Sequence, residues 1–123
     1  MVQNLDVECA KLGQRLAEGD GVDEELVNDA LTVLEEQGVY AFFLYLKARG
    51  REGANHVSTT CAEFLRSVPQ GSPLLDGGDV FNSLQRLSQN LDDLLFARDL
   101  LRQALVYGRY QVKARGASSG GRR

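Results

Sequence analysis

The chain is poor in the side chains from which catalytic and metal sites are usually built. Its 123 residues include one histidine, two cysteines and no tryptophan. One histidine and two isolated cysteines cannot supply the close Cys/Cys or Cys/His spacing of a zinc site, and few groups with a tunable pKa could converge on a pocket. We therefore expect no enzyme activity, no metal site and no cofactor.

Long hydrophobic runs are also lacking. The longest dense apolar stretch, residues 39–46, is far shorter than the ~20 residues that a helix needs to cross a bilayer. No basic N-terminus followed by an apolar run indicates a signal peptide, so we expect a cytoplasmic protein. Cys9 and Cys61 both fall on apolar helix faces, where we expect free thiols that pack as small hydrophobic groups.

What the chain does have is helical periodicity. Apolar residues recur at steps of three and four, and no segment alternates with a period of two. This predicts an all-α, single-domain five- or six-helix bundle over residues 1–115, followed by a flexible tail at 116–123. The predicted helices lie near residues 3–18, 23–37, 39–49, 54–67 and 80–114. Whether the last one is broken or only bent at Ser88–Asn90 stays open, since Asn90 with Asp93 can cap a new start.

The third predicted helix is apolar on nearly every side, and composition alone fits a buried strand as well as a buried helix. Context favours the helix, because no second strand is predicted to pair with it and the run ends in basic residues and Gly50. We expect this helix to be the buried centre of the bundle, with Phe43 and Leu44 in the core.

Charge is distributed unevenly along the chain. Residues 1–46 hold ten acidic and two basic residues, whereas the segment from Leu100 onward holds six basic residues and no acidic one. Such polarity suits a protein whose two ends meet different partners, or whose acidic end meets the basic end of the next copy.

The basic residues give the strongest functional signal. Spacings of four, seven and four place most of those in the last helix on roughly one face, with Tyr107 and Tyr110 interleaved and leaning mainly into packing. The candidate nucleic-acid-binding residues are Arg98, Arg102, Arg109, Lys113 and Arg115 in the last helix, with Lys47, Arg49 and Arg51 at the end of the third. The alternatives are a solvated charged face for the first set and favourable charge at a helix C-terminus for the second.

Other polar groups are weaker candidates. His56 could reach a phosphate, but a solvated or capping role suits its place near a helix start. The acidic pairs Glu35–Glu36 and Asp92–Asp93 invite a metal-binding interpretation, yet adjacent residues on a helix point about 100° apart and do not converge. A solvated face is the better interpretation for both pairs.

Two segments together resemble the small subunit of type III CRISPR effector complexes. They are LEEQGVYAFFLYLK at 34–47 and LLFARDLLRQALVYGRY at 94–110. The resemblance implies a non-catalytic helical subunit of a ribonucleoprotein that acts in antiviral defence. It further implies that several copies stack beside other subunits and that basic residues contact the crRNA and target RNA backbone.

A rival hypothesis is a helical adaptor that binds only protein, through the exposed part of residues 39–46. A helix-turn-helix repressor is a weaker alternative, because no short helix pair with a polar recognition helix stands out. Salt-dependent binding of single-stranded RNA separates the first hypothesis from the adaptor, since only the first predicts it.

Overall fold

The computed structural model describes residues 4–120, and side chains up to residue 116. This part of the chain forms one compact helical domain without strands, as the sequence predicts. The six helices are α1 (Leu5–Ala17), α2 (Glu24–Gln37), α3 (Val39–Arg49), α4 (Glu52–Ser67), α5 (Val80–Leu87) and α6 (Leu91–Gly120).

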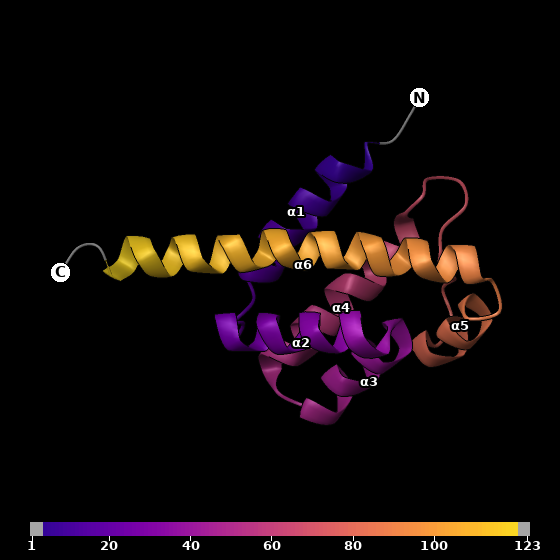
Figure 1. Cartoon of the computed structure of the whole chain (residues 1–123), viewed down its shortest axis with the longest axis horizontal. Helices are drawn as coiled ribbons and strands as arrows, with labels where there is room; N and C mark the ends of the chain where they lie inside the picture. The colour runs from indigo at the N-terminus through magenta and orange to yellow at the C-terminus, as the bar shows by residue number, and fades with distance from the viewer. Residues whose placement is uncertain (1–3, 121–123) are drawn as a thin grey trace.

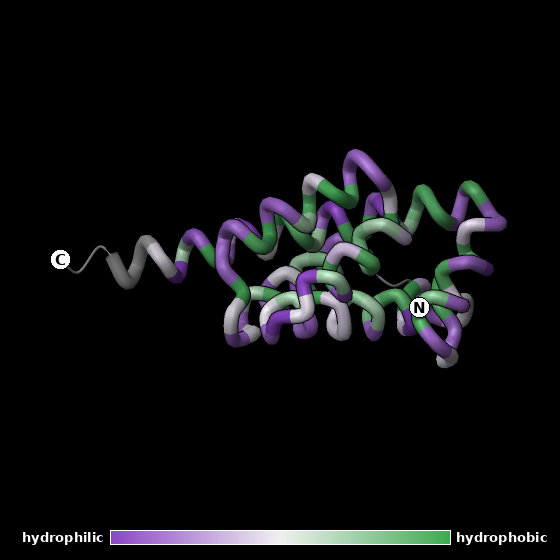
Figure 2. Tube along the Cα trace, turned by 90° about the horizontal axis from the view of Figure 1, so that it is seen from below, coloured by the Kyte–Doolittle hydropathy of each residue, from purple (hydrophilic) through white to green (hydrophobic). Residues whose placement is uncertain are grey.

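The long helix α6 organises the bundle. It runs along the whole length of the molecule, and its C-terminal end projects beyond the other helices (Figures 1 and 2). Helix α1 crosses α6, α2 packs along it, and α5 lies near its start. Helix α3 packs on α2 and α4 and barely touches α6, so α2 lies between α3 and α6.

The open question at Ser88–Asn90 is resolved as a break. Helix α5 ends at Leu87, and the side chain of Asn90 accepts a hydrogen bond from the Asp93 backbone N–H at 3.1 Å. This is the N-cap contact that the sequence allows. At its other end α6 continues to Gly120, so the predicted helix end at 114 is too early and the expected tail begins inside a helix. Residues 121–123 lie outside the described residues.

The core collects the predicted apolar stripes, and α3 contributes its two fully buried phenylalanines, Phe42 and Phe43. Leu44 does not join them, because 49% of it is exposed; its predicted core position is wrong. The two cysteines are free and buried. Burial raises the pKa of Cys9 to about 11 and that of Cys61 to about 12, so both thiols stay protonated and unreactive at neutral pH.

The long loop between α4 and α5 is fastened by Asp76. Its carboxylate accepts hydrogen bonds from the Ser83 hydroxyl, the Gly78 backbone N–H and the Arg86 guanidinium. From the α4 side, Arg66 donates to the backbone carbonyls of Asp76 and Gly78 at 3.0 and 3.1 Å. The loop is therefore tied to both flanking helices by charged hydrogen bonds, which are stronger than neutral ones.

Candidate nucleic-acid interface

The predicted basic stripe of α6 faces an acidic helix. Helices α2 and α6 run antiparallel, so a step forward on one matches a step back on the other. Three side-chain pairs follow from this register, and we call them the α2–α6 ladder: Glu35 with Arg102 (Oε2 to Nε, 2.9 Å), Asn28 with Arg109 (Oδ1 to Nη1, 3.4 Å) and Glu24 with Lys113 (Oε2 to Nζ, 3.5 Å).

The ladder is a surface feature. Arg102, Lys113 and their glutamate partners each keep about half of the side chain exposed. Exposed ion pairs contribute roughly 0–1 kcal/mol to stability, so each pair can exchange its partner at small cost. The basic groups on this edge are thus accessible, but their charge is largely neutralised by α2.

Two basic residues of α6 stay outside the ladder. Arg98 and Arg115 make no hydrogen bond or ion pair within the described part of the chain. Arg98 lines an open depression of about 290 Å³ together with Arg102, Glu35 and Asp99. Because two carboxylates stand beside two guanidinium groups there, the depression is not a basic pocket.

The two tyrosines of α6 behave differently from each other. The Tyr107 hydroxyl donates to the Asp6 carboxylate at 3.0 Å, and its half-buried ring packs against the core, in agreement with the predicted packing role. Tyr110 is 61% exposed, with the Arg109 guanidinium carbon 5.9 Å from its ring centroid. The prediction that Tyr110 leans mainly into packing is therefore wrong.

The second basic cluster is engaged in contacts of its own. Lys47 Nζ lies 5.0 Å from the centroid of the Phe81 ring. Arg49 donates to the Tyr45 hydroxyl at 2.8 Å and lies 3.7 Å from Asp29. The Tyr45 hydrogen bond, with nearby carboxylates, raises the pKa of Arg49 above its usual value.

The third member of that cluster, Arg51, is exposed, and its side chain makes no hydrogen bond or ion pair among the described residues. The cluster and the α6 stripe lie on opposite flanks of α2. Since α2 carries acidic residues and no basic one, the structure does not join the two predicted sets into one basic surface.

His56 has a structural contact. Its Nε2 atom lies 2.9 Å from the Arg15 backbone carbonyl, near the end of α1, and its ring packs against Gly19. With the proton on Nε2, the ring caps the last turn of α1 and not the start of its own helix α4. Glu35 belongs to the ladder, and no group of three or more possible metal ligands occurs among the described residues.

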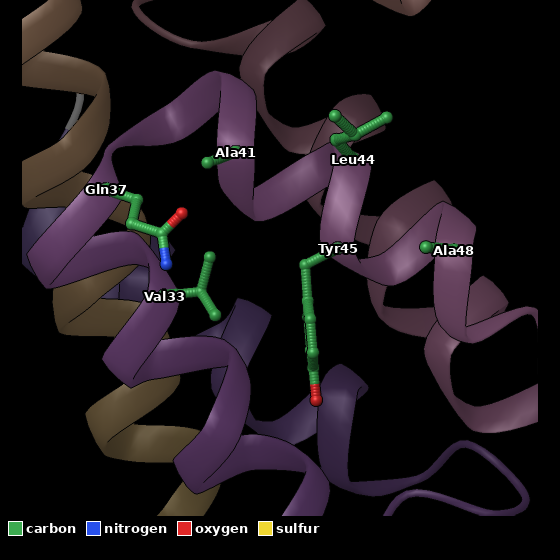
Figure 3. Close-up of a pocket in the computed structure, with 6 residues that line it drawn as sticks. All are labelled: Val33, Gln37, Ala41, Leu44, Tyr45 and Ala48. Atoms are coloured by element: carbon green, nitrogen blue, oxygen red, sulfur yellow. The ribbon is translucent and has the colours of Figure 1, made fainter.

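Sequence reasoning missed an apolar groove on the outer side of α2 and α3. It measures about 230 Å³ and is lined by Val33, Gln37, Ala41, Leu44, Tyr45 and Ala48. Figure 3 shows Val33 and Gln37 of α2 opposite Ala41 and Tyr45 of α3. The two helices meet at an acute corner because Gly38, at φ 98°, is the single residue between them. The available signal was the apolar character of α3 on all its sides.

Comparisons with known proteins add no relative. No protein family, curated protein or solved structure shows significant similarity to this chain. Within residues 4–120, no helix combines the length and the apolar character that crossing a bilayer requires.

Proposed function

We propose that this protein is a non-catalytic small structural subunit of a CRISPR RNA-guided interference complex in the cytoplasm. Several copies stack in the complex, and basic residues contact the crRNA and target backbone. The strand-free bundle agrees with such a subunit. The first resembling segment covers the α2–α3 corner and includes most of the residues that line the apolar groove. The second covers residues 94–110 of α6 and includes Arg102 and Arg109 of the ladder.

The observation that carries the proposal is the exposed basic edge of α6. Arg102, Arg109 and Lys113 follow one another along it, and the helix has no acidic residue after Asp99. A nucleic-acid backbone offers phosphates at regular intervals, and binding it releases counterions. Phosphates can replace the carboxylates of α2 because exposed ion pairs are weak.

The ladder allows a test with two opposite outcomes. Arg102→Gln with Lys113→Gln removes two cations and should weaken binding of single-stranded RNA, lowering the salt slope by about one to two. Glu24→Gln with Glu35→Gln leaves the cations and removes their competitors, so it should strengthen binding. Titrations of a labelled RNA of about 20 nucleotides at several salt concentrations, with the isolated chain, measure both effects.

Lys11→Gln is the matched control. Lys11 lies on α1, outside both basic clusters, and its amino group is 4.0 Å from Glu8. The Lys11→Gln variant has a lower net charge than wild type but an unchanged α6, so its affinity for RNA should stay close to that of wild type. Equal binding by both double variants and wild type would contradict RNA contact through this edge.

The second candidate function is the protein-only adaptor, which the apolar groove favours. Leu44, which lines the groove, exposes 49% of its surface on α3, where an ordinary surface helix would place a polar residue. This function predicts no RNA affinity in any of the variants above. It also predicts that substitutions in the groove, and not those in the ladder, release a partner protein.

A further inference from the structure

We infer that the α2–α3 groove of one copy receives the outward face of the C-terminal part of α6 of a second copy. The inference rests on the stacking part of the proposed function and names the two surfaces that would meet. We call residues 110–116 of α6 the arm, and the exposed acidic residues of α2 outside the ladder, namely Glu25, Asp29 and Glu36, the acidic ridge.

The groove is apolar at its centre and acidic on its α2 side. Glu25, Asp29, Val33 and Gln37 recur every four residues and follow one stripe of α2, with Glu36 on the adjoining stripe. The side chain of Asp29 reaches Arg49 of α3, and the charge of Glu25 helps to raise the pKa of Arg49. The side chains of Glu25 and Glu36 make no hydrogen bond or ion pair within residues 4–116. The occupant that fits is a helix with an apolar strip and basic flanks.

The outer face of α3 also favours a helical occupant. Ala41, Leu44 and Ala48 recur at steps of three and four along the uncovered side of the helix. The small alanine side chains would let another helix approach closely, and Leu44, half exposed, offers the main apolar contact.

The arm has the matching chemistry. All of its residues except Val112 are exposed, and it carries Lys113 and Arg115 but no acidic residue. Tyr110 and Ala114 are four residues apart and share one face. Lys113 lies beside them and would exchange its exposed ion pair with Glu24 of its own chain for the acidic ridge of the second copy. This face presents an aromatic ring and a methyl group flanked by positive charge, complementary to the groove and its acidic ridge.

The arm cannot fill the groove of its own chain. Helix α2 lies between α6 and α3 (Figure 1). The groove residues Val33 and Gln37 are on a different stripe of α2 from the ladder residues that face α6. The contact must therefore join two copies. Because the arm and the groove are different surfaces, each pairing leaves one of each free, and such a head-to-tail contact extends into an open stack.

Sedimentation velocity of the full chain without RNA tests the inference, from about 10 µM to about 1 mM, because a contact below about 1,000 Å² is expected to be weak. Leu44→Asp disables the groove and Tyr110→Asp disables the arm, and each should reduce association at least tenfold. Both residues are exposed, so the fold should persist. Leu91→Asp, at a 66% exposed position at the other end of α6, is the matched control and should associate like wild type.

The decisive sample is an equimolar mixture of Leu44→Asp and Tyr110→Asp. One variant keeps its arm and the other its groove, so the mixture should form a one-to-one dimer although each variant alone stays monomeric. A monomeric wild type, or a mixture that fails to pair, overturns the inference. Because RNA is absent, that failure leaves the RNA titrations unaffected, and a failure of RNA binding leaves this result unaffected.

Discussion

Gly13 of α1 and Gly108 of α6 lie against each other where the two helices cross. A Cβ atom on Gly13 would come within 2.8 Å of the Gly108 backbone nitrogen and 2.6 Å of the Tyr107 Cβ atom. Helix α1 thus touches the backbone of α6 directly, with no side chain between them at this point. The close approach brings Tyr107 within hydrogen-bond distance of Asp6.

Gly13→Ala should therefore destabilise the protein. Alanine has a higher helix propensity than glycine by about 1 kcal/mol, but the methyl group would collide with backbone atoms that cannot turn away. Overpacking of this kind costs about 1–3 kcal/mol, and we expect it to prevail. Urea unfolding measures the change, with Gly116→Ala as control, since no atom lies within 4 Å of a Cβ there. A Gly13→Ala variant at least as stable as wild type would show that the helices can separate freely.

Phe43 and Leu44 are neighbours in sequence with opposite environments. Phe43 is fully buried, so Phe43→Ala should cost about 3–5 kcal/mol through lost burial and a residual cavity. Leu44→Ala should change the free energy of unfolding by only about 0.5 kcal/mol, because Leu44 is half exposed. Thermal unfolding of the two variants side by side measures this contrast, and similar losses would mean that Leu44 is covered in solution.

Asp76 should make stability depend on pH in the acid range. Hydrogen bonds from the Ser83 hydroxyl, the Gly78 N–H and Arg86 lower its pKa from 3.8 to about 2. A lowered pKa in the folded state stabilises the protein above the unfolded pKa, and this contribution is lost as the pH falls through about 2. The difference in melting temperature between wild type and Asp76→Asn should thus shrink from about pH 4 to about pH 2.

Asp20→Asn is the control for Asp76, because Asp20 is exposed and makes no hydrogen bond or ion pair in the described part of the chain. Its melting temperature should follow wild type at each pH. A difference between wild type and Asp76→Asn that stays constant down to about pH 2 would contradict the assigned pKa.

The N-cap of α6 should have a measurable effect. Asn90→Ala removes the acceptor for the Asp93 N–H and should cost about 1 kcal/mol, within the usual range for caps. Gln89→Ala changes an exposed side chain next to the cap and should cost little. Chemical denaturation compares the two, and equal stabilities would mean that solvent caps α6 as well as Asn90 does.

The sequence predicts the helices well because each signal is local. Apolar steps of three and four mark α1, α2 and α4, and Asn90 marks the start of α6. Helix α3 is the exception within this group. Its apolar residues cover every side, so periodicity cannot say which side faces solvent, and Leu44 was placed in the core for that reason.

The candidate site depends on contacts between distant segments, which periodicity does not contain. The spacing of Arg102, Arg109 and Lys113 correctly indicates one edge of α6, but not which helix lies beside that edge. The available signal was that Glu24, Asn28 and Glu35 on α2 have the same spacing, in reverse order, as the three basic residues of α6. This match in spacing can be recognised only once the two helices are known to be antiparallel.

The α2–α6 ladder gives the basic edge a competitor that is part of the same chain. The two glutamates of the ladder occupy the positions at which an external polyanion would bind Arg102 and Lys113. Because they are tethered, their effective concentration at these cations stays the same when the protein is diluted. We therefore expect an isolated copy to bind a polyanion only weakly. A row of copies that engages one long polyanion would make several such contacts at once, so we expect an assembly to bind it more tightly than the single chain does.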